Sequence, residues 1–242
     1  MFKVTKAFTL FSIVFLGVSN VYANHADLEK FEQQIIQKYK NSDYFEVNGE
    51  IEEAISNKIS QDSSSLTYEF PNLQKNNYVS IKYSPDKKLK FYTFDVSGGG
   101  TMGEWYSDVQ YKTNNVIHVD EFTAGSILDI QQVNIENKTI YLIQSYYKGD
   151  SCHGLYNLRA VEIGSKQLLK AYVFEDKNKK SHEIDVEYDC HYDQDRNGAS
   201  SYLRIHPKTI DVMLLNENFI PQNKYLRYSL GKTGYRYTGI VK

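Results

Sequence analysis

The stretch YVSIKYSPDKKLKFYTFDVSGGGTMGEWYSDVQYK, residues 78–112, decides the fold class. It reads as strand, tight turn, strand, glycine-rich loop and strand. Pro85 fixes φ at the first corner of a type I turn, and Ser84 and Asp86 supply side-chain acceptors beside it. Residues on both sides of the turn alternate between two faces, which is the period of a strand. The stretch therefore predicts a β-hairpin followed by a third strand.

The chain beyond residue 65 continues in the same way, with short strand patterns separated by turn signals. The expected strands span 66–70, 79–83, 89–96, 104–112, 116–120, 127–134, 139–147, 156–163, 167–175, 182–190, 202–206, 209–215, 225–230 and 235–241. Short antiparallel strands at this spacing favour a sandwich, an open barrel or a propeller-like meander. The expected fold class is α+β, predominantly antiparallel β.

Two amphipathic helices are expected in residues 24–62, ahead of this β body. The first carries apolar residues at helical spacing, namely Leu28, Phe31, Ile35 and Tyr39. The second is expected over residues 50–59, with Asn48 as its N-cap. Ile51, Ile55 and Ile59 recur every four residues and form its buried stripe.

Residues 1–23 have the pattern of a secretory signal peptide. Lys3 and Lys6 precede an apolar run over residues 7–18, and Ala23 suits the cleavage site. The mature chain would be a single β-rich domain over residues 24–242, with its β body in 66–242 and no integral membrane segment. Loss of the two lysines takes the formal net charge from −2 to −4, which argues against nucleic-acid binding. The expected location is periplasmic or secreted.

Part of the opening stretch also resembles a known group of proteins. The matching residues are Ser84-Pro85-Asp86, Lys90 to Asp95, Gly99-Gly100-Thr101-Met102 and Gln110-Tyr111-Lys112. Over residues 78–112 they are similar to a segment of uncharacterised exported proteins of Gram-negative bacteria. The resemblance implies a bacterial envelope protein, and it implies no activity.

The chain contains two cysteines, Cys152 and Cys190. An even pair in an exported chain is most simply one disulfide. Because His153 and His191 follow the two cysteines directly, a zinc or copper site is the alternative. Neighbouring residues of a strand point to opposite faces, so the two pairs are not expected to converge, and the disulfide is preferred.

Two further motifs suggest chemistry. Ser151, in Gly149-Asp150-Ser151, is a candidate nucleophile of a hydrolase, although no adjacent base or oxyanion site is recognisable. Asp193, Asp195 and Asn197 alternate ahead of a glycine, as in the first half of a calcium loop. Calcium is the ion that this second motif suggests, and no other cofactor is implied. An ordinary hairpin tip is the competing interpretation.

Residues 182–190 alternate strictly, with four acids on one face: Glu183, Asp185, Glu187 and Asp189. Four like charges cannot be buried unpaired, so this face is expected to meet water, a metal or a cationic partner. We expect an exported protein without catalytic function that binds another envelope or secreted protein through this face, in an inhibitor- or immunity-type role. The alternatives are an envelope hydrolase using Ser151 or a metal site, and a calcium-stabilised structural or adhesive module.

Overall fold

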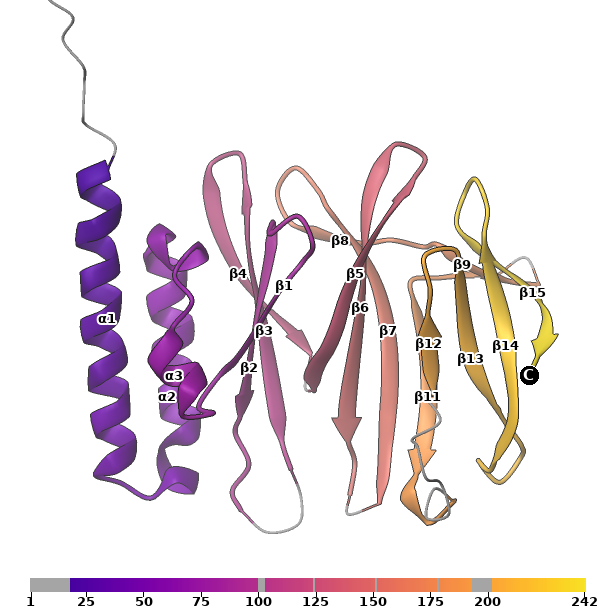
Figure 1. The fold of residues 1–242 in the computed structure, drawn as a ribbon, viewed down its shortest axis with the longest axis horizontal. Coiled ribbons are helices and arrows are strands. Elements are labelled where there is room, and N and C mark those ends of the chain that lie inside the picture. Colours follow the sequence, from indigo (N-terminus) through magenta and orange to yellow (C-terminus); the bar gives the residue numbers. More distant parts are fainter. Residues whose placement is uncertain (1–17, 100–102, 124, 151, 178, 193–201) are drawn as a thin grey trace, which may run out of the picture.

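The computed structural model describes residues 18–99, 103–123, 125–150, 152–177, 179–192 and 202–242. The described elements form four layers side by side, a helical layer followed by three β-sheets (Figure 1). We call the sheets the first, second and third sheet. The chain enters the layers in this order, but it returns to the second sheet for one strand after its first strands in the third.

The helical layer contains the two expected helices and two short additions. Its elements are α1 (Val18–Lys40), α2 (Tyr44–Gln61), the 3-10 helix η1 (Ser63–Leu66) and α3 (Pro71–Lys75). The predicted isoleucine stripe of α2 is confirmed, since Ile51, Ile55 and Ile59 are fully buried. The predicted N-cap was wrong: α2 begins at Tyr44 with Asp43 as its cap, and the Asp43 carboxylate accepts from the Phe45 amide. Asn48 is instead a buried residue within the helix.

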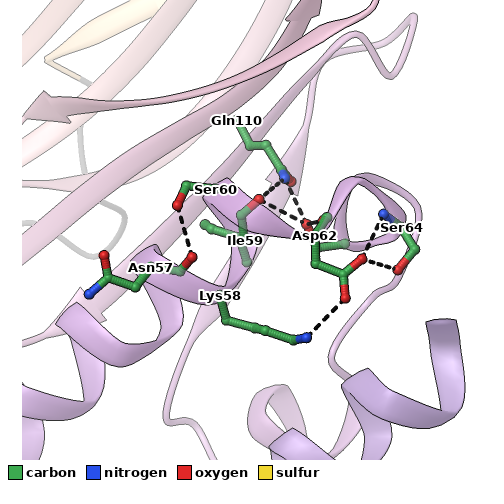
Figure 2. Close-up of polar contacts among 8 residues, drawn as sticks. Asn57, Lys58, Ile59, Ser60, Asp62, Ser64 and Gln110 are labelled. Carbon is green, nitrogen blue, oxygen red and sulfur yellow. Dashed lines mark hydrogen bonds and ion pairs between the residues drawn. The ribbon is translucent and has the colours of Figure 1, made fainter.

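The end of α2 is joined to the first sheet by hydrogen bonds (Figure 2). Gln110 donates from Nε2 to the Ile59 carbonyl at 2.9 Å and to Ser65 Oγ at 2.7 Å. Asp62, the N-cap of η1, accepts from the amide and hydroxyl of Ser64. These contacts satisfy the carbonyl and amide groups that a helix end leaves unpaired.

The short helix α3 is capped by a side chain from α1. Its own cap residue, Phe70, has φ 46° and contributes no side-chain hydrogen bond. The buried Glu32 carboxylate accepts instead from the amides of Asn72 (2.9 Å) and Leu73 (3.0 Å). A carboxylate at a helix N-terminus pairs with free N–H groups and with the positive end of the helix dipole. Glu32 therefore joins α1 to α3 through a buried polar contact.

The fifteen described strands are divided among the three sheets. The first sheet has the order β1-β2-β3-β4, with bounds Ser80–Tyr83, Leu89–Asp95, Trp105–Thr113 and Val116–Thr123. The second has the order β11-β7-β6-β5, with bounds Glu183–Asp189, His153–Ile163, Lys138–Lys148 and Ser126–Ile135, and β8 (Leu168–Lys170) pairs with β7. The third has the order β10-β9-β15-β14-β13-β12, with bounds Lys179–Ser181, Phe174–Asp176, Tyr235–Val241, Pro221–Leu230, Thr209–Leu215 and Leu203–Ile205. All described pairings are antiparallel except that of β15 with β9.

Three apolar cores lie between the four layers, and single strands contribute to two of them. In β2, Phe91 packs toward the second sheet while Tyr92 and Phe94 pack under the helices. In β6, Ile143 packs toward the first sheet and Leu142 toward the third. A strand that is buried on both faces is apolar almost continuously rather than in alternation.

The expected fold class is corrected in two respects. The strands do not form a sandwich, an open barrel or a propeller-like meander; the described residues form three stacked sheets with a helical layer on one side, within an α+β fold of mostly antiparallel sheets. Of the predicted disulfide between Cys152 and Cys190, the described residues show no bonded pair. The side chain of Cys190 lies outside them.

Three local predictions were also wrong. Residues 66–70, expected as a strand, are the end of η1 and the approach to α3. The strand expected over 167–175 is divided into β8 and β9, which belong to different sheets. The interval between the strands expected over 167–175 and 182–190 contains a further strand, β10. By contrast, the hairpin of β1 and β2 is confirmed, with the Lys87 amide bonded to the Ser84 carbonyl at 2.8 Å.

Candidate functional site

The strand with four acids is β11, and it is the end strand of the second sheet. It pairs with β7 in a register that places Glu183 opposite Arg159, Asp185 opposite Asn157 and Asp189 opposite His153. Ile184 and Val186, on the other face, pack into the core with the third sheet. The burial of these two apolar residues fixes the four acids on the opposite face, because side chains alternate along a strand.

The four acids differ in their partners. Glu183 lies 3.6 Å from the Nε of Arg159 and 3.6 Å from the Nε2 of His182. Asp185 accepts from the Asn157 amide at 2.6 Å, a neutral partner that leaves its charge in place. Glu187 is exposed. We call Glu183, Asp185, Glu187 and Asp189 the acidic edge.

Arg159 supports the middle of this face from β7. Its guanidinium lies 5.1 Å from the centre of the Phe122 ring and donates to the Phe122 carbonyl at 2.7 Å. Arginine can stack on an aromatic ring and donate hydrogen bonds in the same plane. Arg159 therefore links the second sheet to the first through Phe122. It also partly neutralises the charge of Glu183.

An apolar groove of about 320 Å³ runs beside the acidic edge. One wall is β11, and the other belongs to the third sheet. Its lining residues are Asp185, Val186, Glu187, Val212, Met213, Leu214, Leu215, Asn216, Phe219 and Leu226. Phe219, at the edge of the groove, is 49% exposed. Acids and exposed apolar surface thus adjoin along one edge of the molecule.

A second group of side chains lies where β11 ends. His153 contacts Asp150 through Nδ1 at 2.8 Å and Asp189 through Nε2 at 3.3 Å. His191 contacts the other oxygen of Asp189 through Nδ1 at 2.7 Å. We call Asp150, His153, Asp189 and His191 the His–Asp cluster.

The electrostatics of the His–Asp cluster favour its charged forms. The hydrogen bond that the His153 ring donates to Asp150, followed by the charge of that carboxylate, raises the pKa of His153. Backbone hydrogen bonds from His153 and Cys152 lower the pKa of Asp150 to about 2. The backbone amide of His191 lowers the pKa of Asp189. Both carboxylates are therefore ionised throughout the neutral range.

Three of the four residues in the two Cys-His pairs, namely Cys152, His153 and His191, lie close together, contrary to the expectation from strand alternation. His153 begins β7, whereas β11 ends at Asp189 and the chain then turns as the 3-10 helix η2 (Cys190–Tyr192). The rings of His153 and His191 are 6.3 Å apart, and the ligand-type atoms of Cys152, Asp189 and His191 lie within 4.8 Å of one another. Alternation did not apply, because only one of the four residues is inside a strand.

Several predicted site residues cannot be placed. Ser151, the candidate nucleophile, lies outside the described residues. So do Asp193, Asp195 and Asn197, the candidate calcium ligands. The structure therefore does not bear on those two interpretations.

The groove was missed by sequence reasoning. Its second wall comes from β13 and the turn after it, which lie in a different sheet from β11. The only signal was the apolar run of residues 212–215, which is longer than a strand with one wet face requires. Such a run indicates burial or contact on both faces, but it does not tell which element lies opposite.

Among the described residues, none of the helices combines the length and the apolar character that crossing a membrane requires. A scan against protein-family models and searches of curated proteins and of solved structures give no match to this chain.

Proposed function

We propose that this chain is an exported, protein-binding module whose binding surface is the acidic edge together with the apolar groove beside it. The partner is a protein segment in extended conformation that carries Lys or Arg residues in alternation with apolar residues. An inhibitor- or immunity-type role is the form of this function that we favour. The N-terminal sequence pattern supports export to the periplasm or beyond.

Charge is the first support. Among the described residues, Glu183 and Asp189 lie within 4 Å of cationic side chains, whereas Asp185 and Glu187 do not. These two acids are exposed and line the groove directly. A cationic segment would be attracted to them, and surface charge of one sign raises association rates with an oppositely charged partner.

The position of β11 is the second support, and it is the observation on which the proposal mainly rests. β11 is the terminal strand in the order of the second sheet, so one side of its backbone is not paired within that sheet. An extended segment can add to such an edge by main-chain hydrogen bonds, with its alternate side chains read by pockets. The groove supplies an apolar pocket at this edge, with Phe219 as an exposed aromatic contact.

The test compares partner capture by matched variants. The double variant Asp185→Ser and Glu187→Ser removes the two acids without a cationic neighbour and leaves Asp189 in place. The matched control, Asp129→Ser and Glu136→Ser, removes the same charge from exposed positions at the β5 end of the second sheet, the end opposite to β11. Each purified protein is used to capture partners from envelope extract, and the captured protein is then measured against the purified chain by surface plasmon resonance.

We expect the wild type and the control to capture the same partner. The variant of the acidic edge should bind this partner about tenfold more weakly, which corresponds to a loss of about 1–2 kcal/mol at the interface. The association rate of wild type should fall with added salt. Equal affinity of the edge variant and wild type would contradict the proposal. Esterase activity of the chain that is lost on Ser151→Ala would support the hydrolase instead.

A further inference from the structure

We propose that His153, Asp189 and His191 bind a divalent transition-metal ion of the class that prefers imidazole, such as Zn²⁺, where β7 begins and β11 ends. The inference does not depend on the proposed partner binding. It rests on the orientation of one histidine, on one distance, and on the exposure of the second histidine.

The orientation of His153 is that of a metal-binding histidine. The ring is held through Nδ1 by Asp150, whose second oxygen also accepts from the amides of Cys152 (2.8 Å) and His153 (2.7 Å). Metal-binding histidines commonly have one nitrogen held by a carboxylate, which fixes the tautomer and directs the other nitrogen at the metal. Here the other nitrogen, Nε2, is directed at Asp189.

The distance from His153 Nε2 to Asp189 Oδ2 is 3.3 Å. This is longer than the usual N–H···O hydrogen bond, which peaks near ~2.9 Å. Two ligands bonded at about 2.1 Å to one tetrahedral Zn²⁺ lie about 3.4 Å apart. The pair is thus spaced as two ligands along one edge of such a site, and a small rotation of either side chain accommodates the ion between them.

His191 provides the third ligand. It contacts the other oxygen of Asp189 at 2.7 Å, its ring lies 6.3 Å from that of His153, and its side chain is 64% exposed. The exposed ring can move toward the ion at little packing cost. Two imidazoles and one carboxylate, with a fourth position open to water, form a known type of zinc site. The sulfur of Cys152 lies near the same group, but the proposal takes no ligand from it.

The experiment titrates ZnCl₂ alone into the full-length, tag-free chain and follows binding by isothermal titration calorimetry. We expect one ion per chain in the wild type, and affinities at least about tenfold weaker for His153→Asn and for His191→Asn. The matched control is the variant His206→Asn, which should bind zinc like the wild type. His206 is an exposed histidine that follows β12 in the third sheet. Circular dichroism spectra establish that each variant is folded.

A second measurement needs no variant. Paramagnetic Cu²⁺, added in substoichiometric amount to the wild type, should broaden the ring resonances of His153 and His191 before those of His118 and His206. Zinc should then restore them by displacement. Uniform broadening of all histidines, or zinc affinity that is unchanged in both variants, would overturn the proposal, and neither result would bear on partner binding at Asp185 and Glu187.

Discussion

Lys90 is the residue at which burial and charge conflict most strongly. It is fully buried between the helical layer and the first sheet, and its ammonium donates to the carbonyls of Ser65 and Tyr68. The rings of three aromatic residues surround it, namely Phe70, Tyr83 and Tyr92. Burial lowers the pKa of Lys90 from its ordinary value of 10.5 to about 7, although the charge of Glu69 opposes this effect. The folded protein therefore holds this proton less tightly than the unfolded chain does.

The stability of the protein should depend on pH through Lys90. Below pH 7 the lysine is protonated in both states, whereas above pH 7 the folded state loses the proton and the unfolded state keeps it until about pH 10.5. The free energy of unfolding should therefore rise by about 2 kcal/mol between pH 7 and pH 9. Lys90→Met, which has no titrating group, should lack this rise. Urea unfolding at both pH values measures it, and a similar rise in Lys90→Met would assign the effect to other groups.

At the scale of elements, α2 is held against β3 by a hydroxyl between two carboxylates. Ser56 contacts Glu52 at 3.0 Å and also Asp108, which is 4% exposed. A hydroxyl has one proton to donate, so it cannot satisfy two ionised carboxylates at once. Burial, and then the mutual repulsion of neighbouring acids, raises the pKa of Glu52 and of Asp108. The contact between helix and sheet is thus weaker when both acids are ionised.

Asp108→Asn should stabilise the contact between α2 and β3 at neutral pH. Because the folded pKa of each acid lies above its unfolded value, the favourable effect of protonation is present at low pH and lost as pH rises through the folded pKa. The amide keeps the shape but not the charge, so the free energy of unfolding at pH 7 should rise by about 1 kcal/mol. The gain should vanish near pH 4. Asp129→Asn, at an exposed position of β5, is the control and should change little. Destabilisation by Asp108→Asn at pH 7 would refute the argument.

At the scale of the whole molecule, the layers are stacked so that the second sheet is shared by two cores. β6 contributes Ile143 to the core with the first sheet and Leu142 to the core with the third, and both side chains are buried. Proteins made of stacked layers can lose cooperativity if each layer contacts only its neighbours. A strand with both faces buried opposes this loss, because its unfolding disrupts two cores together.

Ile143→Ala and Leu142→Ala should each lower the free energy of unfolding by about 2–5 kcal/mol, as expected for large-to-small changes in a core. The single tryptophan, Trp105, lies in the first sheet and reports on it alone by fluorescence. If unfolding is cooperative, Leu142→Ala shifts the urea midpoint seen at Trp105 as much as the midpoint seen by circular dichroism. Gln132→Ala, at an exposed position, should shift neither. A shift seen by circular dichroism but not at Trp105 would mean that the third sheet unfolds separately.

Sequence reasoning succeeded where the signal is local. The stripe of α2 follows from a spacing of four residues, and the β1–β2 hairpin from Pro85 and the acceptors beside it. It failed where a distant residue decides the local structure. Residues 66–70 have strand propensity, but Glu32 from α1 caps a helix that begins at Pro71. The groove and the His–Asp cluster depend on the pairing of β11 with β7 and on its position beside the third sheet, and neither is encoded in a local pattern.

The sequence by itself determined the two N-terminal helices, most strands of the antiparallel body and the acidic face of β11. These features follow from periodicity and turn chemistry, which act over a few residues. Only the tertiary structure decided that the strands form three stacked sheets, that Lys90 is buried and that His153 and His191 meet at Asp189. The physical reason is that the hydrophobic effect is non-directional, so a local sequence pattern does not specify which apolar faces pack together. Which faces meet depends on the packing of all layers together.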